Sequence, residues 1–141
     1  PLRTKKDVDA LIRGLKDGSF KVISTDHAPH TDAEKARGLA DSAMGIVGLE
    51  CAFAVLYTEL VRSGILSLEK LIDLMSVRPR KRFGIDTKQD FTVFDVGVPY
   101  TIDPDNFLSM GHATPFAGMR VFGKCLLTVA RGKIIYREAN V

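Results

Sequence analysis

Residues 20–30 read Phe-Lys-Val-Ile-Ser-Thr-Asp-His-Ala-Pro-His, a mostly apolar run followed at once by one acid and two imidazoles. Residues 20–24 have the length and apolar character of a strand buried in a parallel sheet, which would carry Asp26 to the end of that strand. Loops that follow strand ends form the active sites of α/β barrels, where an acid beside histidine can bind a divalent metal or move a proton. The stretch therefore predicts an α/β fold with its chemistry at residues 24–30.

The chain is short for such a site. It has 141 residues and only 3 His, and His112 lies far along the chain in a Gly-bearing stretch. A metal hydrolase needs three or more ligands around one centre. The sequence also begins with Pro1-Leu2-Arg3, without an initiator Met, and enters a helix pattern at once. We therefore expect it to be the carboxyl-terminal part of a longer protein.

The composition is that of a packed, cytoplasmic protein. Hydrophobic residues make up 45% and charged residues 26% of the chain, which excludes disorder, and the net charge of +3 is slight. No apolar run is long enough to cross a membrane. Cys51 and Cys125 fit no metal spacing, and with no secretory segment they predict reduced thiols. The basic cluster Arg78, Arg80, Lys81 and Arg82 has no aromatic ladder or phosphate loop beside it, so we expect a solvated helix face and no nucleic-acid partner.

The first part of the chain carries helix signals. Thr4 can cap a helix with Asp7 three residues on, and Gly18 ends it. A second helix is predicted over residues 49–62, ending before Gly64. The expected buried faces are Val8, Leu11, Ile12 and Leu15 in the first helix and Leu49, Ala52, Phe53, Leu56 and Leu60 in the second.

Between and after these helices the pattern changes. Residues 31–48 are polar and contain three Gly, which indicates a long loop over the strand end. Ser67 begins a further helix, with Leu66 and Leu71 as a hydrophobic staple and Leu68, Ile72 and Met75 completing its buried face. Pro79 suits the first turn of a short helix that ends at Gly84. Residues 91–96, 118–122, 124–130 and 133–136 are predicted strands, the last two joined by a tight Arg131-Gly132 turn.

This order of elements resembles the end of an amidohydrolase, and within that superfamily a dihydroorotase of the long-chain bacterial type. The resemblance rests on Pro1-Leu2-Arg3, Ser24-Thr25-Asp26-His27-Ala28-Pro29-His30, Gly45-Ile46-Val47-Gly48-Leu49-Glu50 and Thr114-Pro115-Phe116-Ala117-Gly118. It implies that residues 1–84 form the carboxyl-terminal segment of a metal-dependent TIM-like barrel. Residues 85–141 would form part of a small composite β domain.

The resemblance also implies roles for a few residues. Asp26 would approach one or two zinc ions, as a ligand, and shuttle the proton during the reversible hydrolysis of dihydroorotate to N-carbamoyl-L-aspartate, a step of pyrimidine biosynthesis. His30 would bind the substrate carboxylate, and Gly45 and Ile46 would offer backbone groups to the ring. The remaining zinc ligands belong to the amino-terminal portion that this chain lacks, so we expect the chain alone to be inactive.

Two features qualify this resemblance, and the expected partners follow from it. His27 is expected to be structural rather than a ligand. Ser42-Ala43-Met44 stands where Pro-Phe commonly precedes the Gly, a departure from the family pattern that would place a flexible Met at the pocket. The expected partners are the missing amino-terminal portion, a second copy in a homodimer, or aspartate transcarbamoylase.

Other interpretations stay open. Hydantoinases and allantoinases have a similar Asp-His pair but generally lack the final His, so they are the runner-up family. The chain could also be a non-catalytic dihydroorotase-like scaffold domain, or a free-standing β-rich interaction module. The retained Asp26 and His30 disfavour a scaffold, and a buried strand ending in an acid disfavours an interaction module.

Overall fold

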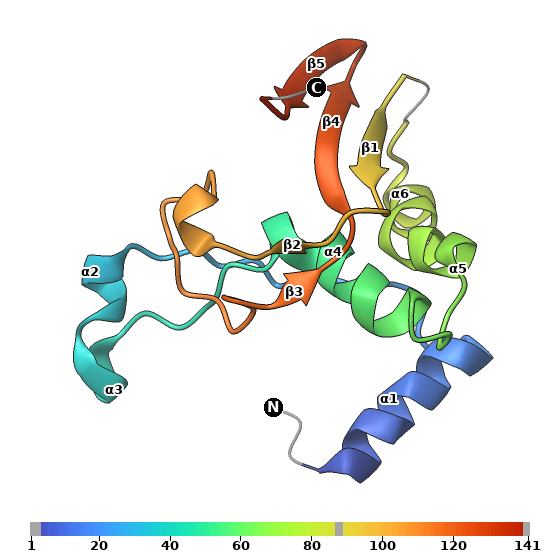
Figure 1. Cartoon of the computed structure of the whole chain (residues 1–141). Coiled ribbons are helices and arrows are strands. Elements are labelled where there is room, and N and C mark those ends of the chain that lie inside the picture. The colour runs from blue at the N-terminus through green and yellow to red at the C-terminus, as the bar shows by residue number, and fades with distance from the viewer. Residues whose placement is uncertain (1–3, 87–88, 140–141) are drawn as a thin grey trace.

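The computed structural model describes residues 4–86 and 89–139, so the expected Pro1-Leu2-Arg3 segment lies outside the described residues. Helices form the middle of the molecule, a three-stranded sheet stands at one end, and an arm carrying two short helices extends away from them (Figure 1). The order of elements is that of an α/β protein. The expected α/β class is confirmed.

The first helix, α1 (Lys5–Asp17), ends as its sequence predicts. Thr4 accepts a hydrogen bond from the Asp7 amide, and the Asp7 carboxylate accepts one in return from the Thr4 amide, so both members of the capping box are present. Gly18 adopts a left-handed φ of 82° at the other end. The expected buried face is wrong in part, because Val8 and Leu11 are 41% and 39% exposed.

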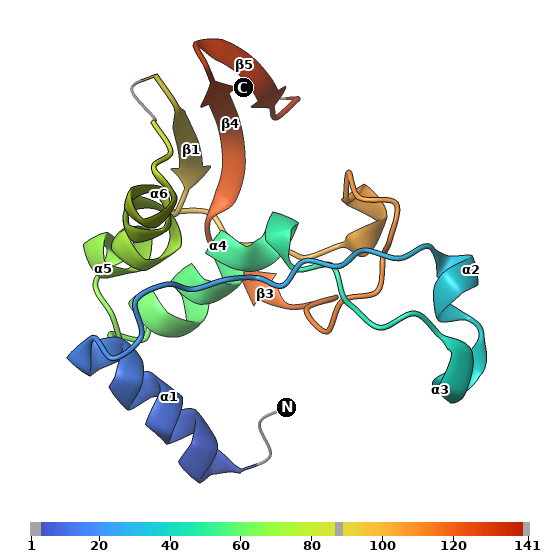
Figure 2. The same cartoon turned by 180° about the vertical axis from the view of Figure 1, so that it is seen from behind.

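The strand expected over residues 20–24 does not form. The segment runs as an extended coil from α1 past α4 toward α2 (Figure 2), and the described part of the chain has a ladder contact only after it, a parallel bridge between His27 and Ile46. The Ile23 amide instead donates to the Leu74 carbonyl of a helix at 3.0 Å. A strand exists only against a partner strand, and the described residues supply just the short stretch around Ile46.

The long loop expected over residues 31–48 contains two helical turns, α2 (Asp32–Lys35) and α3 (Gly38–Asp41). Thr31 caps α2 with a full capping box to Glu34. This Thr-x-x-Glu signal was present in the sequence and was missed. The remaining residues, 42–48, form the expected irregular segment.

The helical middle matches the sequence pattern closely. One continuous helical segment consists of η1 (Leu49–Cys51), α4 (Ala52–Leu56) and η2 (Tyr57–Val61). A second consists of α5 (Leu68–Ile72), η3 (Asp73–Val77) and α6 (Arg78–Phe83). Ser67 caps α5, and Gly84 ends α6 with φ 65°. Two expected core residues are exposed instead: Leu49 (61%), which begins η1, and Ile72 (44%), which ends α5.

The sheet at the end of the molecule has the strand order β1-β4-β5, all antiparallel. Its strands are β1 (Phe91–Asp95), β4 (Lys124–Ala130) and β5 (Lys133–Arg137), close to the predicted ranges. Arg131 and Gly132 make the tight turn with φ 51° and 73°. A separate ladder joins β2 (Tyr100–Thr101), which was not predicted, to β3 (Arg120–Val121), and η4 (Pro104–Asn106) lies between them in sequence.

A buried cluster joins helix α4 to the short ladder. Its fully buried members are Cys51, Ala54, Ile102 and Val121. These residues come from both sides of residue 84, and the division into a barrel segment and a β domain stays a prediction. No helix in the described ranges has the length and apolarity to span a membrane.

Candidate active site

Asp26 occupies an exposed turn with an unusual backbone. Its φ is 45°, in the left-handed region that few residues other than Gly adopt. Such a conformation costs about 1–2 kcal/mol and often marks a functional position. Its carboxylate makes no hydrogen bond or ion pair within residues 4–86 and 89–139. The turn therefore presents an acid that is free to bind a ligand or a proton.

His27, unlike Asp26, is hydrogen-bonded to the surrounding chain. Its Nδ1 accepts hydrogen bonds from the backbone amides of Gly48 and Leu49, at 3.2 Å and 3.3 Å. Because an amide can only donate, Nδ1 carries no proton and Nε2 is the protonated nitrogen of the neutral ring. Nε2 lies 3.4 Å from the Ser109 hydroxyl. His27 thus ties the Asp26 turn to the start of η1, which fits the expected structural role.

Glu50 anchors a distant loop beside this histidine. Its carboxylate accepts from the Ser109 hydroxyl at 2.6 Å and from the amides of Leu108 and Ser109 at 2.7 Å and 3.0 Å. Desolvation acts to raise the pKa of Glu50, but these hydrogen bonds and the nearby His27 outweigh it and hold the pKa below its usual value. Sequence reasoning missed this cluster, since 59 residues separate its members.

His30 is half-buried between two acceptors. Its Nε2 lies 2.9 Å from the Met44 carbonyl, and its Nδ1 lies 3.8 Å from the Glu34 carboxylate. The backbone of Gly111 packs directly against the backbone of His30. The ring is therefore held in one orientation by its own chain, next to the Asp26 turn.

The Gly45 to Gly48 segment lies beside the same turn. Gly45 has φ 135°, and a Cβ there would come within 2.5 Å of the Ala28 side chain, so only Gly fits. The Ala28 amide donates to the Ile46 carbonyl at 3.0 Å. Lys35 also stabilises the segment, because its Nζ donates to the carbonyls of Ala43 and Gly45 at 2.9 Å and 3.0 Å. The structure thus brings together three of the expected residue groups: the turn with Asp26 and His30, Gly45, and Ile46.

His112 approaches this region as well. Its Nδ1 lies 3.5 Å from the Asp32 carboxylate at the start of α2. The adjacent Ala113 carbonyl accepts from the Val47 amide at 2.9 Å. The stretch 108–113 therefore contacts both sequence motifs, although it looked remote along the chain.

A zinc ion fits this arrangement only in part. The described residues contain no group of three or more His, Cys, Asp or Glu that could hold a metal. A free carboxylate is a suitable zinc ligand, and Asp26 supplies one. A complete site needs ligands from outside this chain.

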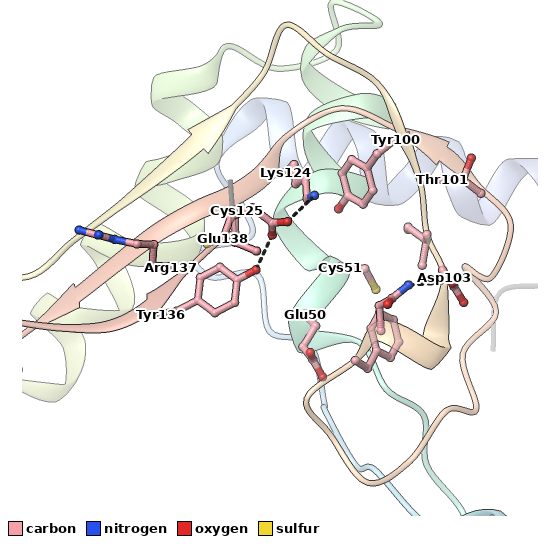
Figure 3. Close-up of a pocket in the computed structure, with 14 residues that line it drawn as sticks. Glu50, Cys51, Tyr100, Thr101, Asp103, Lys124, Cys125, Tyr136, Arg137 and Glu138 are labelled. Carbon is pink, nitrogen blue, oxygen red and sulfur yellow. Dashed lines mark hydrogen bonds and ion pairs between the residues drawn. The ribbon is translucent and has the colours of Figure 1, made fainter. Parts of the chain in front are cut away.

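A separate cleft of about 570 Å³ lies on the other side of Glu50 (Figure 3). Lys124 donates to Glu138 at 2.9 Å, and the Tyr136 hydroxyl donates to the same carboxylate at 2.8 Å. The bond to Glu138, with some burial, raises the pKa of Tyr136 to about 12. Burial raises the pKa of the Cys51 thiol in the cleft wall. Asp26 and His30 are not among the residues that line this cleft.

Comparison with known sequences decides the family. No family model matches the chain. A dihydroorotase of Geobacillus sp. (strain WCH70) is 46% identical over 99% of the chain, and one of Lactiplantibacillus plantarum is 46% identical over 96%. The chain belongs to the dihydroorotase family. It spans about a third of the length of these dihydroorotases, 34% of each, and corresponds to a carboxyl-terminal portion.

Solved structures of other amidohydrolases share the fold of this dihydroorotase segment. A D-hydantoinase from Bacillus sp. AR9 has a TM-score of 0.88 at 27% identity, covering 97% of the chain and 33% of the hydantoinase. A dihydropyrimidinase from Brevibacillus agri NCHU1002 has a TM-score of 0.87 at 29% identity, with 97% and 32% covered. The expected partial amidohydrolase fold is confirmed, and the relatives are cyclic amidohydrolases.

Proposed function

We propose that the protein to which this segment belongs is a dihydroorotase that reversibly hydrolyses dihydroorotate to N-carbamoyl-L-aspartate in pyrimidine biosynthesis. The observation that carries the proposal is the 46% identity over 99% of the chain to a protein of that name. The free carboxylate of Asp26, on a left-handed turn beside His30, supports it. Hydrolysis of a cyclic amide needs such an acid near the attacked carbonyl.

Asp26 acts on protons in this proposal. A zinc ion held by Asp26 and by ligands outside the chain would lower the pKa of a bound water to about 7. The Asp26 carboxylate accepts a proton from the attacking water and then returns it to the ring nitrogen as the amide bond breaks. No hydrogen bond to Asp26 within the described ranges competes with the metal or with this transfer, so one oxygen can hold the metal and the other can take the proton.

His30, Gly45 and Ile46 bind the substrate in this proposal. A histidine can donate a charge-assisted hydrogen bond to the substrate carboxylate; Nε2 of His30 is taken by the Met44 carbonyl, and Nδ1, 3.8 Å from the Glu34 carboxylate, is the nitrogen left for the substrate. Gly45 carries no Cβ, so its backbone packs closely against Ala28 and stays beside the turn. Ile46 follows it at the parallel bridge to His27.

The other partners follow from exposed apolar surface. Large side chains are exposed on the extended segment and on both outer strands of the sheet: Phe20, Val22, Phe91, Val93, Ile134 and Ile135. Such surface associates. We propose that it packs against the amino-terminal portion of the enzyme, and that the complete cytoplasmic enzyme forms homodimers or binds aspartate transcarbamoylase. A compact monomer of this chain alone in sedimentation would contradict this packing.

A hydantoinase-type activity is the second candidate, and the shared fold with hydantoinases is the observation that favours it. It fits less well, since those structures are 24–29% identical to this chain whereas the dihydroorotases are 43–48% identical. A competition assay separates the two. The full-length enzyme should have a higher kcat/KM for dihydroorotate than for hydantoin or allantoin, and the reverse order would favour the hydantoinase.

A further inference from the structure

We propose that Glu50 is a positioning residue that acts through Ser109 and His27 to fix the turn carrying Asp26. This inference rests on the proposed function, because it concerns how the proton-transfer residue is aimed. Within the described ranges Glu50 makes no hydrogen bond or ion pair with Asp26 or with any expected substrate-binding residue. Its effect must therefore pass through its neighbours.

The first link joins Glu50 to residues 108–109. The carboxylate accepts three hydrogen bonds from this stretch, two from backbone amides and one from the Ser109 hydroxyl. Several hydrogen bonds to one carboxylate fix both its orientation and that of its donors. The Ser109 hydroxyl is thus held with its proton toward Glu50 and a lone pair free for another donor.

The second link joins Ser109 to His27. The hydroxyl lies 3.4 Å from Nε2, and Nδ1 of the same ring accepts from the Gly48 and Leu49 amides. These two amides require Nε2 to be the protonated nitrogen, which then donates to Ser109. Every donor in this chain of hydrogen bonds therefore faces an acceptor, from the Leu49 amide to the Glu50 carboxylate. The arrangement permits a single ring orientation.

The third link joins His27 to Asp26. His27 makes a parallel bridge to Ile46, and on the other side of Asp26 the Thr25 carbonyl lies close to Gly48, at 3.4 Å from the position of a Cβ there. Asp26, with φ 45°, thus lies between the bridged His27 and Thr25, which packs near Gly48, and we infer that these two neighbours maintain its conformation. A left-handed conformation persists only when its surroundings hold it. Releasing His27 should let the Asp26 carboxylate leave its catalytic orientation.

The experiment uses Ser109→Ala in the full-length enzyme. Loss of the hydroxyl should lower kcat about tenfold with KM nearly unchanged, as for other residues that orient a catalytic group. Amide hydrogen exchange should become faster at Gly48 and Leu49, which Ser109 does not touch. Ser109→Thr keeps the hydroxyl and should restore both readouts. Ser63→Ala is the matched control, since among the described residues the Ser63 hydroxyl bonds only a helix carbonyl, that of Glu59.

A second pair of variants covers the case in which Ser109→Ala does not fold. Glu50→Gln keeps the shape but loses the charge, and it should act in the same direction. Glu138→Gln is its control, because Glu138 also accepts two side-chain hydrogen bonds but lies at the end of the sheet. Normal kcat, or unchanged exchange at Gly48 and Leu49, in a folded Ser109 or Glu50 variant would overturn the inference. A wild-type enzyme without dihydroorotase activity would instead overturn the proposed function, and the exchange data would then decide the link by themselves.

Discussion

Gly111 lies in direct backbone contact with His30, although 81 positions of sequence separate them. A Cβ on Gly111 would clash with the His30 carbonyl oxygen and would lie 2.8 Å from the His30 amide nitrogen. Backbone atoms of a turn held at several points cannot easily move aside. A stretch late in the chain thus fixes the turn that bears the proposed catalytic acid.

Gly111→Ala should therefore destabilise the full-length enzyme by about 1–3 kcal/mol, the usual cost of overpacking. Urea unfolding would measure this. The matched control is Gly97→Ala, because a Cβ on Gly97 would meet only the Asp95 carboxylate at 3.5 Å, an ordinary contact. Equal stability of the two variants would contradict this, because it would show that the His30 backbone moves aside at little cost in free energy.

Asp26→Asn should keep the fold and lose activity. Asn tolerates the left-handed backbone as Asp does, while its amide cannot accept the proton of the attacking water. Turnover of dihydroorotate should fall at least about a hundredfold, the usual contribution of general-base catalysis. Steady-state kinetics alongside circular dichroism would test both parts. Near-normal kcat would remove Asp26 from the proton-transfer role.

His30→Ala should act on binding more than on turnover. Loss of a charge-assisted hydrogen bond to the substrate carboxylate costs about 1.5–3 kcal/mol, which is roughly a 10- to 150-fold rise in the dissociation constant. Calorimetric titration with N-carbamoyl-L-aspartate would measure it. His112→Ala is the control, because that ring faces the exposed Asp32 carboxylate. Unchanged affinity in the His30 variant would refute its substrate contact.

The sequence predicted local structure well where the signal was itself local. The Thr4 and Asp7 capping box, the Gly84 helix end and the Arg131-Gly132 turn depend on neighbouring residues, and all three form. The strand over residues 20–24 failed because a strand needs a partner, and the one bridge nearby in the described residues lies beyond it, at His27. Strand β2 was missed because two residues carry no alternation.

The candidate site was likewise predicted only where its signal lay in neighbouring residues. The Asp26 and His30 turn was found from adjacent residues and a family resemblance, and their roles remain predictions. The contacts of Glu50 and His27 with Ser109 join residues 59 and 82 positions apart. No periodicity or spacing in one sequence reports such a contact. The fold of the intervening chain decides it.

The stability of the protein should fall at alkaline pH. The pKa of Tyr136 is raised to about 12 by its hydrogen bond to Glu138 and by burial. Its contribution to the free energy of unfolding is therefore complete below about pH 10, the pKa in the unfolded chain, and is lost as the pH rises through 12. Between pH 9 and 12, the free energy of unfolding measured in urea should fall less steeply with pH for Tyr136→Phe than for the wild type. Some decline should remain, because burial raises the pKa of Tyr100 to about 12 as well. An identical slope in both proteins would contradict this account.

Hydrolysis of dihydroorotate by the purified, zinc-loaded full-length protein tests the central claim most directly. We predict conversion to N-carbamoyl-L-aspartate, ring closure in the reverse direction, and no activity from residues 1–141 alone, since the described residues hold no complete metal site. An enzyme that leaves dihydroorotate intact but opens hydantoin or allantoin would contradict the assignment.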